Sequence, residues 1–295
     1  MPLPVYIRAA ANQQHPEAVD WATRAIANGG TVTTPIMRAV SNFCYAIDRG
    51  GLRSSMYRVN LFCGGNLSGC LVPLYRSTSF LGTNLGNATD TNFNFVSADF
   101  SETGATGGLK GNGSNKYLVT GLSSSGVGFA NATIPINSIH MGASGSQMEA
   151  GSSGANTLMG GQESNSPFRG VVLWSRYSFS VPTQRRFEVN GQNGSATSFY
   201  TPITTTSAHV IGTLTGTQSI LTENGLQVAL TNYTTAPGEF SSLGNSPIWI
   251  FARGVVGQFA TSARIKGYHC GTGITLEQSK SVADAFIAFN AALNR

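Results

Sequence analysis

Charged side chains are scarce in this sequence. Asp, Glu, Lys and Arg together make up 11% of its 295 residues, against about a quarter in an average soluble domain. The 18 basic and 13 acidic residues leave a net charge of +5, and Arg185 and Arg186 are the only adjacent basic pair. Because nucleic-acid binding needs a concentrated basic surface, nucleic acid is not an expected partner.

Long apolar runs are also missing. No segment approaches the about 20 apolar residues that a membrane-spanning helix needs, so no membrane partner is expected. The first twenty residues include Glu17 and Asp20 and lack the apolar stretch of a secretory signal. If the protein acts outside a cell, we therefore expect another route of exit, such as the release of assembled particles.

Cysteine occurs only at positions 44, 63, 70 and 270, too few to hold a chain of this size together by disulfides. Cys63 and Cys70 bracket "CGGNLSGC" and would be bridged if that segment forms a hairpin, while separate buried thiols are the simpler interpretation. No C-x-x-C motif or Cys/His pair with zinc-site spacing is present, so a zinc centre is not expected.

Two short helices are predicted in an N-terminal segment, residues 1–55. The first begins near Pro16, ends at Gly29 and has Val19, Ala22 and Ile26 on one face. The second has Thr34 as its expected N-cap, followed by an apolar stripe of Ile36, Val40, Phe43 and Ile47. Two helices of this length bury little surface alone, so we expect Trp21 and Phe43 to pack them against the rest of the chain or a partner subunit.

Short apolar or alternating runs, each bounded by turn residues, fill residues 56–272. The turn pairs Asn190-Gly191 and Asn224-Gly225 predict tight hairpins. Many short strands without intervening helices predict a mainly β fold, a two-sheet antiparallel jelly-roll sandwich. Residues 80–165 contain "LGTNLGNATDTNFN" and "GASGSQMEAGSSGANTLMGG", which are expected to be long connections.

The segment "GGLKGNGSNKYLVTG", residues 107–121, has the glycine spacing of a phosphate-binding loop. Ser114 stands where that loop needs lysine, and Tyr117 opens a β-like run where a helix should begin. We therefore expect a glycine-containing turn that leads into a strand.

A closing helix is predicted over residues 275–293. Thr275 and Gln278 have capping-box spacing, and an apolar stripe follows, formed by Val282, Phe286, Phe289 and Leu293. This helix is expected to pack on the sandwich, so that residues 56–295 form one unit.

The order of several motifs resembles that in a known family. "GLKGNGSNKYLVTGL" is followed by "VVLWSRYS", "RFEVNGQ", "PIWIFARG" and a final run from "SARIKGYHC" to "AALNR". Over residues 55–295 this order resembles the concanavalin A-like, laminin-G-like sandwich proteins among bacteriophage virion structural proteins. The resemblance implies a virion location, as a capsid decoration protein, head fibre or tail adhesin. It also implies contact with other virion proteins and sister subunits, and it supplies no catalytic residues.

Candidate ligand sites are few. Tyr200 and Tyr233 flank polar loops, where an exposed ring could stack on a sugar. Asp90, Asn92 and Asn94 alternate in "DTNFN" and have the oxygen-rich character that calcium prefers. The full ligand set of a calcium site is missing, so no cofactor is expected and calcium stays open.

Catalytic motifs are not found. No expected strand carries the two alternating carboxylates of sandwich glucanases, and Glu188 is expected to face solvent. No G-x-S-x-G occurs, and His140 and His209 are expected to be ordinary polar residues of loops or strands. The sequence favours a non-enzymatic virion surface protein that displays a lectin-like sandwich and could bind host glycans. The alternatives are a virion-associated polysaccharide depolymerase and a free carbohydrate-binding module.

Overall fold

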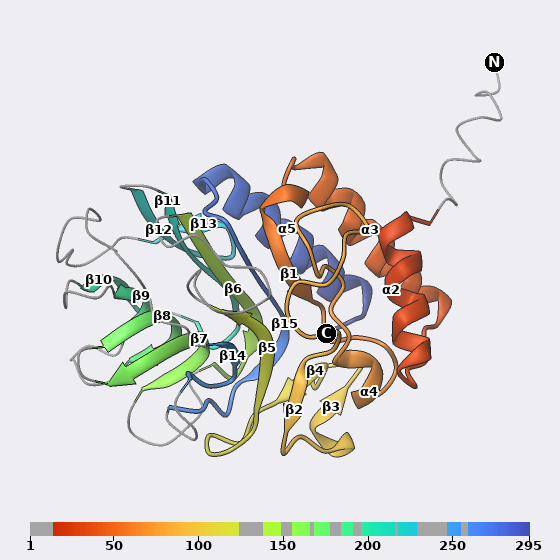
Figure 1. The fold of residues 1–295 in the computed structure, drawn as a ribbon, viewed down its shortest axis with the longest axis horizontal. Helices are drawn as coiled ribbons and strands as arrows, with labels where there is room; N and C mark the ends of the chain where they lie inside the picture. Colours follow the sequence, from red (N-terminus) through yellow and green to blue (C-terminus); the bar gives the residue numbers. More distant parts are fainter. Residues whose placement is uncertain are drawn as a thin grey trace.

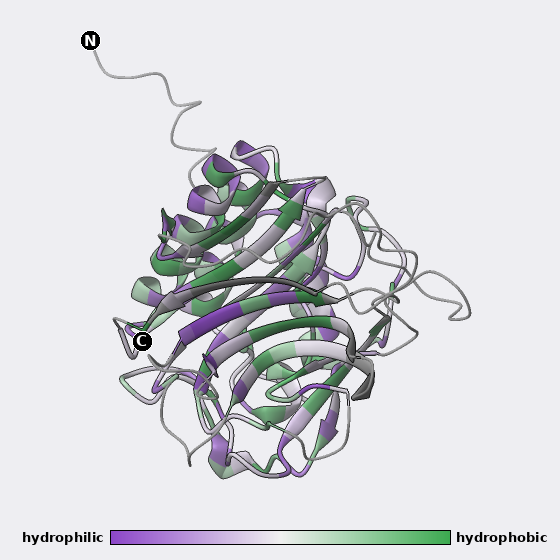
Figure 2. Ribbon diagram, turned by 90° about the vertical axis from the view of Figure 1, so that its left-hand side faces the viewer, coloured by the Kyte–Doolittle hydropathy of each residue, from purple (hydrophilic) through white to green (hydrophobic). Residues whose placement is uncertain are grey.

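The computed structural model describes residues 14–123, 138–148, 155–165, 168–177, 184–190, 196–203, 205–215, 218–228, 247–254 and 259–295. Within these ranges the chain forms two antiparallel sheets, with helices gathered at one side of the molecule (Figure 1, Figure 2). The mainly β sandwich with helices at both ends of the chain, as predicted from the sequence, is confirmed. No helix in these ranges is long and apolar enough to cross a bilayer.

The larger sheet contains eight strands in the described ranges. Its order is β13-β12-β11-β6-β15-β4-β3, and β1 also pairs with β15. The strands are β1 (Met56–Asn60), β3 (Phe100–Ser101), β4 (Gly108–Lys110), β6 (Ser138–Ser146), β11 (Ala208–Thr215), β12 (Gln218–Glu223), β13 (Leu226–Gln227) and β15 (Arg264–Gly271).

The second sheet contains seven strands in the same ranges, in the order β10-β9-β8-β7-β14-β5-β2. The strands are β2 (Thr91–Phe93), β5 (Tyr117–Ser123), β7 (Asn156–Asn165), β8 (Phe168–Tyr177), β9 (Gln184–Asn190), β10 (Ala196–Pro202) and β14 (Pro247–Ile250).

The eight-stranded sheet lies between two apolar cores. On β11, Val210 packs into the core between the sheets, whereas its neighbour Ile211 packs into a second core with the helices. This follows from the two-residue period of a strand, which sends successive side chains to opposite faces. The molecule therefore has three layers: the seven-stranded sheet, the eight-stranded sheet and the helices.

The helical layer consists of α2 (Pro16–Ala27), α3 (Thr34–Arg49) and α5 (Leu276–Ala292), with a short α4 (Leu67–Cys70) nearby. The ring of Phe43 lies 5.0 Å from that of Phe286 and 6.1 Å from that of Phe289. The indole N–H of Trp21 donates to the carbonyl of Val72 at 3.1 Å. The N-terminal helices thus pack on the same core as α5.

The buried face of α2 differs from the prediction. Val19 and Ile26 are 43% and 57% exposed, although they were expected to face inward. The bulky Trp21 occupies the inward position, where its ring is buried and its N–H finds an acceptor. The buried side is formed by Ala18, Trp21, Ala22 and Ala25. The N-cap of α3 is Thr33, one residue before the expected Thr34.

Residues 142–146 and 156–161 were wrongly interpreted as parts of a long connection, because the structure places them in two strands, 138–146 and 156–165. These strands are β6, near the centre of the eight-stranded sheet, and β7 of the other sheet. Glycine in these strands allows neighbouring backbone to approach closely. A Cβ on Gly160, for example, would lie only 2.8 Å from the Val171 carbonyl oxygen, which is too close. A strand composed of small residues gives no apolar alternation, so its sequence resembles a loop.

Residues 107–121 form β4, a turn and the start of β5, as expected. Gly108 and Gly113 have φ of +106° and +71°, a region that favours glycine. The predicted hairpin at Asn224-Gly225 is also confirmed, because it joins β12 to β13 with φ of +51° and +78°. Gly191 of the other predicted turn lies outside the described residues, although β9 and β10 do pair.

The closing helix matches its prediction. Thr275 Oγ1 accepts from the Gln278 N–H at 3.2 Å, and the Gln278 side chain accepts from the Thr275 N–H at 2.9 Å. The whole predicted stripe of α5 is buried. All four cysteines are buried free thiols, and burial raises the pKa of Cys270 to about 12.

Candidate functional site

The predicted calcium residues do not form a common site. Asp90 is buried and its carboxylate accepts from Arg58 at 2.8 Å, from Asn60 at 2.8 Å and from the Tyr268 hydroxyl at 2.8 Å. The exposed Asn92 accepts from the Phe95 N–H at 2.9 Å. The Asp90 carboxylate is therefore paired with a buried guanidinium, and both of its oxygens already accept from protein donors.

The third residue, Asn94, is exposed and donates to the carbonyl of Asn115 at 2.9 Å. In the part of the chain that the structure describes, no group of three or more His, Cys, Asp or Glu side chains could hold a metal ion. Of the two tyrosines proposed to bind sugar, Tyr233 lies outside the described residues. Tyr200 lies on β10, where only the backbone is described.

His140 and His209 are strand residues, but they are not surface residues. With His269 they lie wholly buried between the eight-stranded sheet and α5. His209 Nε2 and His269 Nε2 are 2.9 Å apart, and the His209 ring lies 4.4 Å from that of Phe286. Burial lowers the pKa of His140 to about 4 and that of His209 to about 3. This environment favours neutral imidazoles that pack with the core.

Glu188 is not a solvent-facing residue, contrary to expectation. It is 8% exposed, and its carboxylate accepts from the Trp174 indole N–H at 3.1 Å and from Arg186 at 3.1 Å. On β8 and β9 the adjacent Leu173 and Phe187 fill the core between the sheets. Trp174 and Glu188 must therefore lie on the opposite, outer face of the seven-stranded sheet.

On that outer face Glu188 contacts Trp174 and Arg186, and two further rings and a second guanidinium group pack against these two residues. Arg186 lies 4.4 Å from the ring centre of Tyr177. Arg253 lies 5.0 Å from the Trp174 ring and 4.1 Å from the Phe259 ring. We call these residues the outer-face cluster: Trp174, Tyr177, Arg186, Glu188, Arg253 and Phe259.

The outer-face cluster has more positive than negative charge, since it contains two arginines and one carboxylate. Burial lowers the pKa of Arg253 to about 10, and Glu188 and Tyr177 oppose that shift. Trp174 is 1% exposed and forms a rigid base, while Tyr177, Arg186 and Phe259 are half-buried and reach the surface. Flat rings bind the C–H faces of sugars, and guanidinium groups bind carboxylates and hydroxyls.

Sequence reasoning missed this cluster because its members are spread over residues 174–259 and no two form a motif. The apolar run "VVLW" is typical of a core strand, and Trp174 at its end is indeed buried, but outside the core between the sheets. One signal in the sequence could have revealed part of the cluster. The alternation in "RRFEVN" puts Arg186 and Glu188 on one side of β9 and Phe187 and Val189 on the other.

No family model and no curated protein matches the sequence. Solved structures match its fold. A Trypanosoma rangeli sialidase with 2,3-difluorosialic acid matches at 12% identity and TM-score 0.50, over 90% of this chain and 37% of its own. The botulinum neurotoxin serotype D binding domain matches at 10% identity and TM-score 0.50, over 81% of this chain and 52% of its own.

A third match, the CBM40 of a Ruminococcus gnavus IT-sialidase bound to α2,3-sialyllactose, has 13% identity and TM-score 0.35, over 47% of this chain and 76% of its own. At these identities the two matches with a TM-score of 0.50 establish the fold alone. The chain spans between 34% and 39% of the length of the first three matched sialidases.

The expectation of a non-enzymatic protein is corrected by these matches. It depended on the lack of recognisable catalytic motifs and on a family resemblance that supplied no catalytic residues, yet a sialidase, an enzyme, shares this fold over 90% of the present chain. A sandwich of this kind therefore gives no reason to exclude catalysis.

Proposed function

We propose that this chain is a surface protein of a bacteriophage particle whose β-sandwich binds host-surface saccharides through the outer-face cluster. Two lines of support are independent of each other. The virion role, as capsid decoration protein, head fibre or tail adhesin, depends on the ordered motifs in residues 55–295. The saccharide role depends on the composition and geometry of the cluster.

The observation that carries the saccharide role is the stacking of two arginines on three rings around one carboxylate. Trp174 and Glu188 hold each other by a hydrogen bond, which fixes the base of the site before any ligand arrives. Such preorganisation reduces the entropy lost on binding. The half-buried edges of Tyr177 and Arg186 would then meet the sugar.

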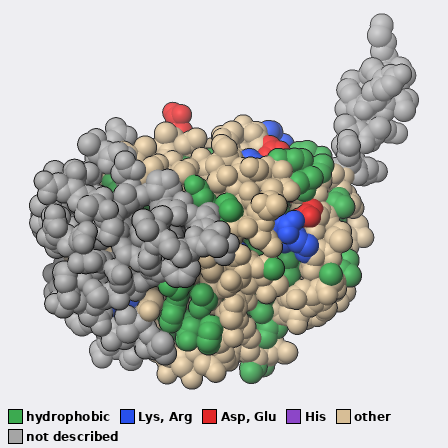
Figure 3. Space-filling view, in the orientation of Figure 1, with side chains coloured by type: hydrophobic (Ala, Val, Ile, Leu, Met, Phe, Trp, Pro, Cys, Tyr) green, Lys and Arg blue, Asp and Glu red, His purple; other side chains and the backbone are tan. Residues whose placement is uncertain are grey.

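The opposite side of the molecule suits attachment to the particle. Val19 and Ile26 present apolar side chains to solvent from α2, which lies far from the outer face of the seven-stranded sheet (Figure 1). On the face shown in Figure 3, few of the coloured atoms belong to Lys, Arg, Asp or Glu, and most of these lie toward the helices. A partner could therefore make both apolar and charged contacts on the helical side. We propose that the helical segment contacts other virion proteins or sister subunits and leaves the outer-face cluster facing outward.

A glycan array tests the saccharide role. Tyr177→Ala and Arg186→Ala should each weaken binding by about 10- to 100-fold, since each removes a stacking or charge-assisted contact of roughly 1.5–3 kcal/mol. Arg38→Ala, which removes an exposed arginine on α3, is the matched control and should bind like the wild type. Equal binding by all three variants would refute the assignment to this cluster.

Mass spectrometry and immunogold labelling of purified particles test the virion role. Label on the shell would indicate a decoration protein or head fibre, and label at the tail would indicate an adhesin. Absence of the chain from purified particles would refute both.

A polysaccharide depolymerase is a second candidate, favoured by the enclosed position of Glu188. A carboxylate held in place by the Trp174 indole N–H and by Arg186 could serve as a nucleophile or general base in glycoside hydrolysis. Release of reducing ends from host polysaccharide, lost in Glu188→Gln and kept in Glu277→Gln on α5, would establish it. No release by the wild-type protein would refute it.

A further inference from the structure

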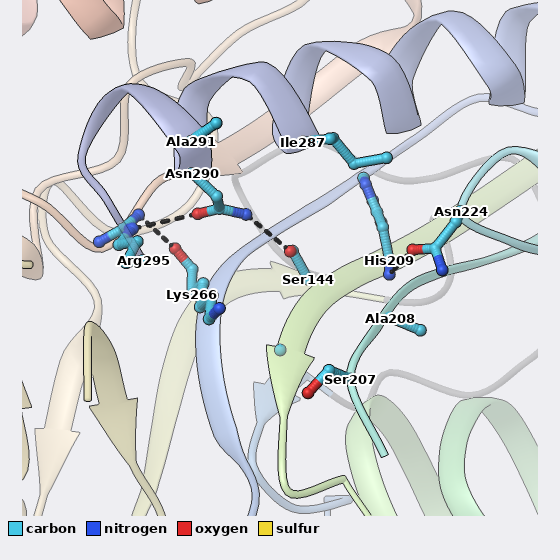
Figure 4. A pocket seen from close by; sticks show the side chains of 11 residues that line it. Ser144, Ser207, Ala208, His209, Asn224, Lys266, Ile287, Asn290, Ala291 and Arg295 are labelled. Atoms are coloured by element: carbon cyan, nitrogen blue, oxygen red, sulfur yellow. Dashed lines mark hydrogen bonds between the residues drawn. The ribbon is translucent and has the colours of Figure 1, made fainter. Parts of the chain in front are cut away.

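A cavity lies on the helix-facing side of the eight-stranded sheet, between the C-terminal part of α5 and strands β6, β11 and β15 (Figure 4). Its volume is about 290 Å³, near the lower end of the range for small-molecule sites. None of its lining residues belongs to the outer-face cluster. It is thus a separate site, and its occupant would have the size of one sugar ring.

The polar groups of this cavity offer donors and few acceptors. Asn224 Oδ1 already accepts from the His209 N–H at 2.9 Å, which leaves its amide N–H groups to donate. Ser144 Oγ accepts from Asn290 at 2.9 Å, which leaves its hydroxyl proton to donate. The Asn290 side-chain oxygen Oδ1 accepts from the Arg295 guanidinium at 3.0 Å. A ligand here must therefore be rich in acceptor oxygens.

The charge of the cavity is positive. Lys266 lines it, and its ammonium makes no hydrogen bond or ion pair with the described residues. Burial lowers the pKa of Lys266, and the neighbouring Arg295 and Arg264 lower it further. No Asp or Glu is present among the described residues that line the cavity. An anion in the cavity would pair with the half-buried Lys266 ammonium and reduce its repulsion by the two arginines.

One wall is apolar. Ile287, which is 45% exposed, and Ala291 lie on α5, across the cavity from Ser207 and Ala208 in Figure 4. An inorganic anion would gain nothing from these groups, whereas the carbon skeleton of a sugar would cover them.

We propose that this cavity binds one carboxylated sugar, with its carboxylate on Lys266 and its hydroxyl oxygens on Asn224 and Ser144. Neither the outer-face cluster nor a virion location is needed for this proposal. A failure here would leave the proposed function standing, and the reverse also holds.

Isothermal titration calorimetry of the full chain tests the proposal, with glucuronate and N-acetylneuraminate as probes. At least one should bind with a millimolar or lower Kd and at least tenfold more tightly than glucose, the neutral comparison. Lys266→Gln should weaken that binding by about 10- to 100-fold, the usual effect of losing one charge-assisted hydrogen bond. Lys280→Gln, at an exposed position of α5, is the matched control and should bind like the wild type.

A second variant tests the same cavity without removing the charge of Lys266. Ala291→Trp, on an exposed position of α5, should fill the cavity and abolish binding while the thermal midpoint stays close to the wild-type value. The proposal is overturned if neither probe binds, if glucose binds as tightly, or if Lys266→Gln binds like the wild type. Sulfate that binds as tightly as the sugar acid would also overturn it, because sulfate cannot cover the apolar wall.

Discussion

Gly142 makes room for the imidazole of His269. The two residues are partners in the register of β6 and β15, and a Cβ on Gly142 would lie 2.1 Å from His269 Nε2. The same nitrogen is 2.9 Å from Nε2 of His209 on β11. Because β6 separates β11 from β15, the two histidines meet across the bare backbone of Gly142 and join strands that are not paired.

Gly142→Ala should therefore destabilise the fold. The added methyl group would push the His269 ring out of its position, and overpacking of this kind costs typically about 1–3 kcal/mol. Urea unfolding followed by fluorescence would give the loss in the free energy of unfolding. The same substitution in a His269→Ala background should cost clearly less, because the clashing ring is gone. Equal costs in both backgrounds would contradict the steric explanation.

The histidine group also predicts a dependence of stability on pH. Burial lowers the pKa of His140 to about 4 and that of His209 to about 3, and it holds that of His269 well below its usual range. In the unfolded chain these groups titrate near 6.5. Between these limits the unfolded state binds more protons, so the free energy of unfolding should fall as the pH decreases from about 6.5 toward 3, by about 1.4 kcal/mol per unit of pKa displacement for each histidine.

Urea midpoints at several pH values between 7.5 and 4 would measure this fall. His140→Gln removes one of the three depressed groups and should make the fall shallower. A midpoint that stays constant down to pH 4 would show that these imidazoles do not titrate as their burial implies.

The helices could be predicted from the sequence because their signals are local. The capping box of α5 and its apolar stripe lie within nineteen residues, 275–293, and the structure reproduces both. Strand β6 could not be predicted from the sequence. Its small residues give it the composition of a loop, but they are there because residues far away in the chain pack closely against them. Gly142 is needed by His269, and Ser144 accepts from Asn290 on α5.

Candidate sites were harder to predict than elements, and Asp90 shows why. In "DTNFN" its carboxylate has the appearance of a calcium ligand. Only the fold brings Arg58 from β1 and Tyr268 from β15 to within hydrogen-bonding distance of it. The local sequence shows which side chains carry oxygen atoms that could bind a metal ion. Whether those atoms are free to do so depends on tertiary contacts.

Asp90→Asn should accordingly be among the more damaging single substitutions. The Arg58 guanidinium is fully buried, and removal of one partner of a buried ion pair costs about 3–5 kcal/mol because the remaining charge stays unpaired. Thermal or urea unfolding would show it. The exposed pair Lys280–Asp284 on α5 offers a matched control, since Asp284→Asn should cost less than about 1 kcal/mol. Similar effects at the two sites would contradict the proposed role of burial.

The cap of α5 gives a prediction of smaller size. Thr275→Ala removes the oxygen that accepts the Gln278 N–H, and loss of an N-cap costs about 1 kcal/mol. Thr275→Ser keeps that oxygen and should stay close to the wild type. Because Phe286 and Phe289 anchor the rest of the helix in the core, the loss should stay local. Hydrogen exchange should accelerate at residues 276–279 in the alanine variant and not around residue 286. Equal acceleration along all of α5 would mean that the cap, rather than the buried stripe, holds this helix in place.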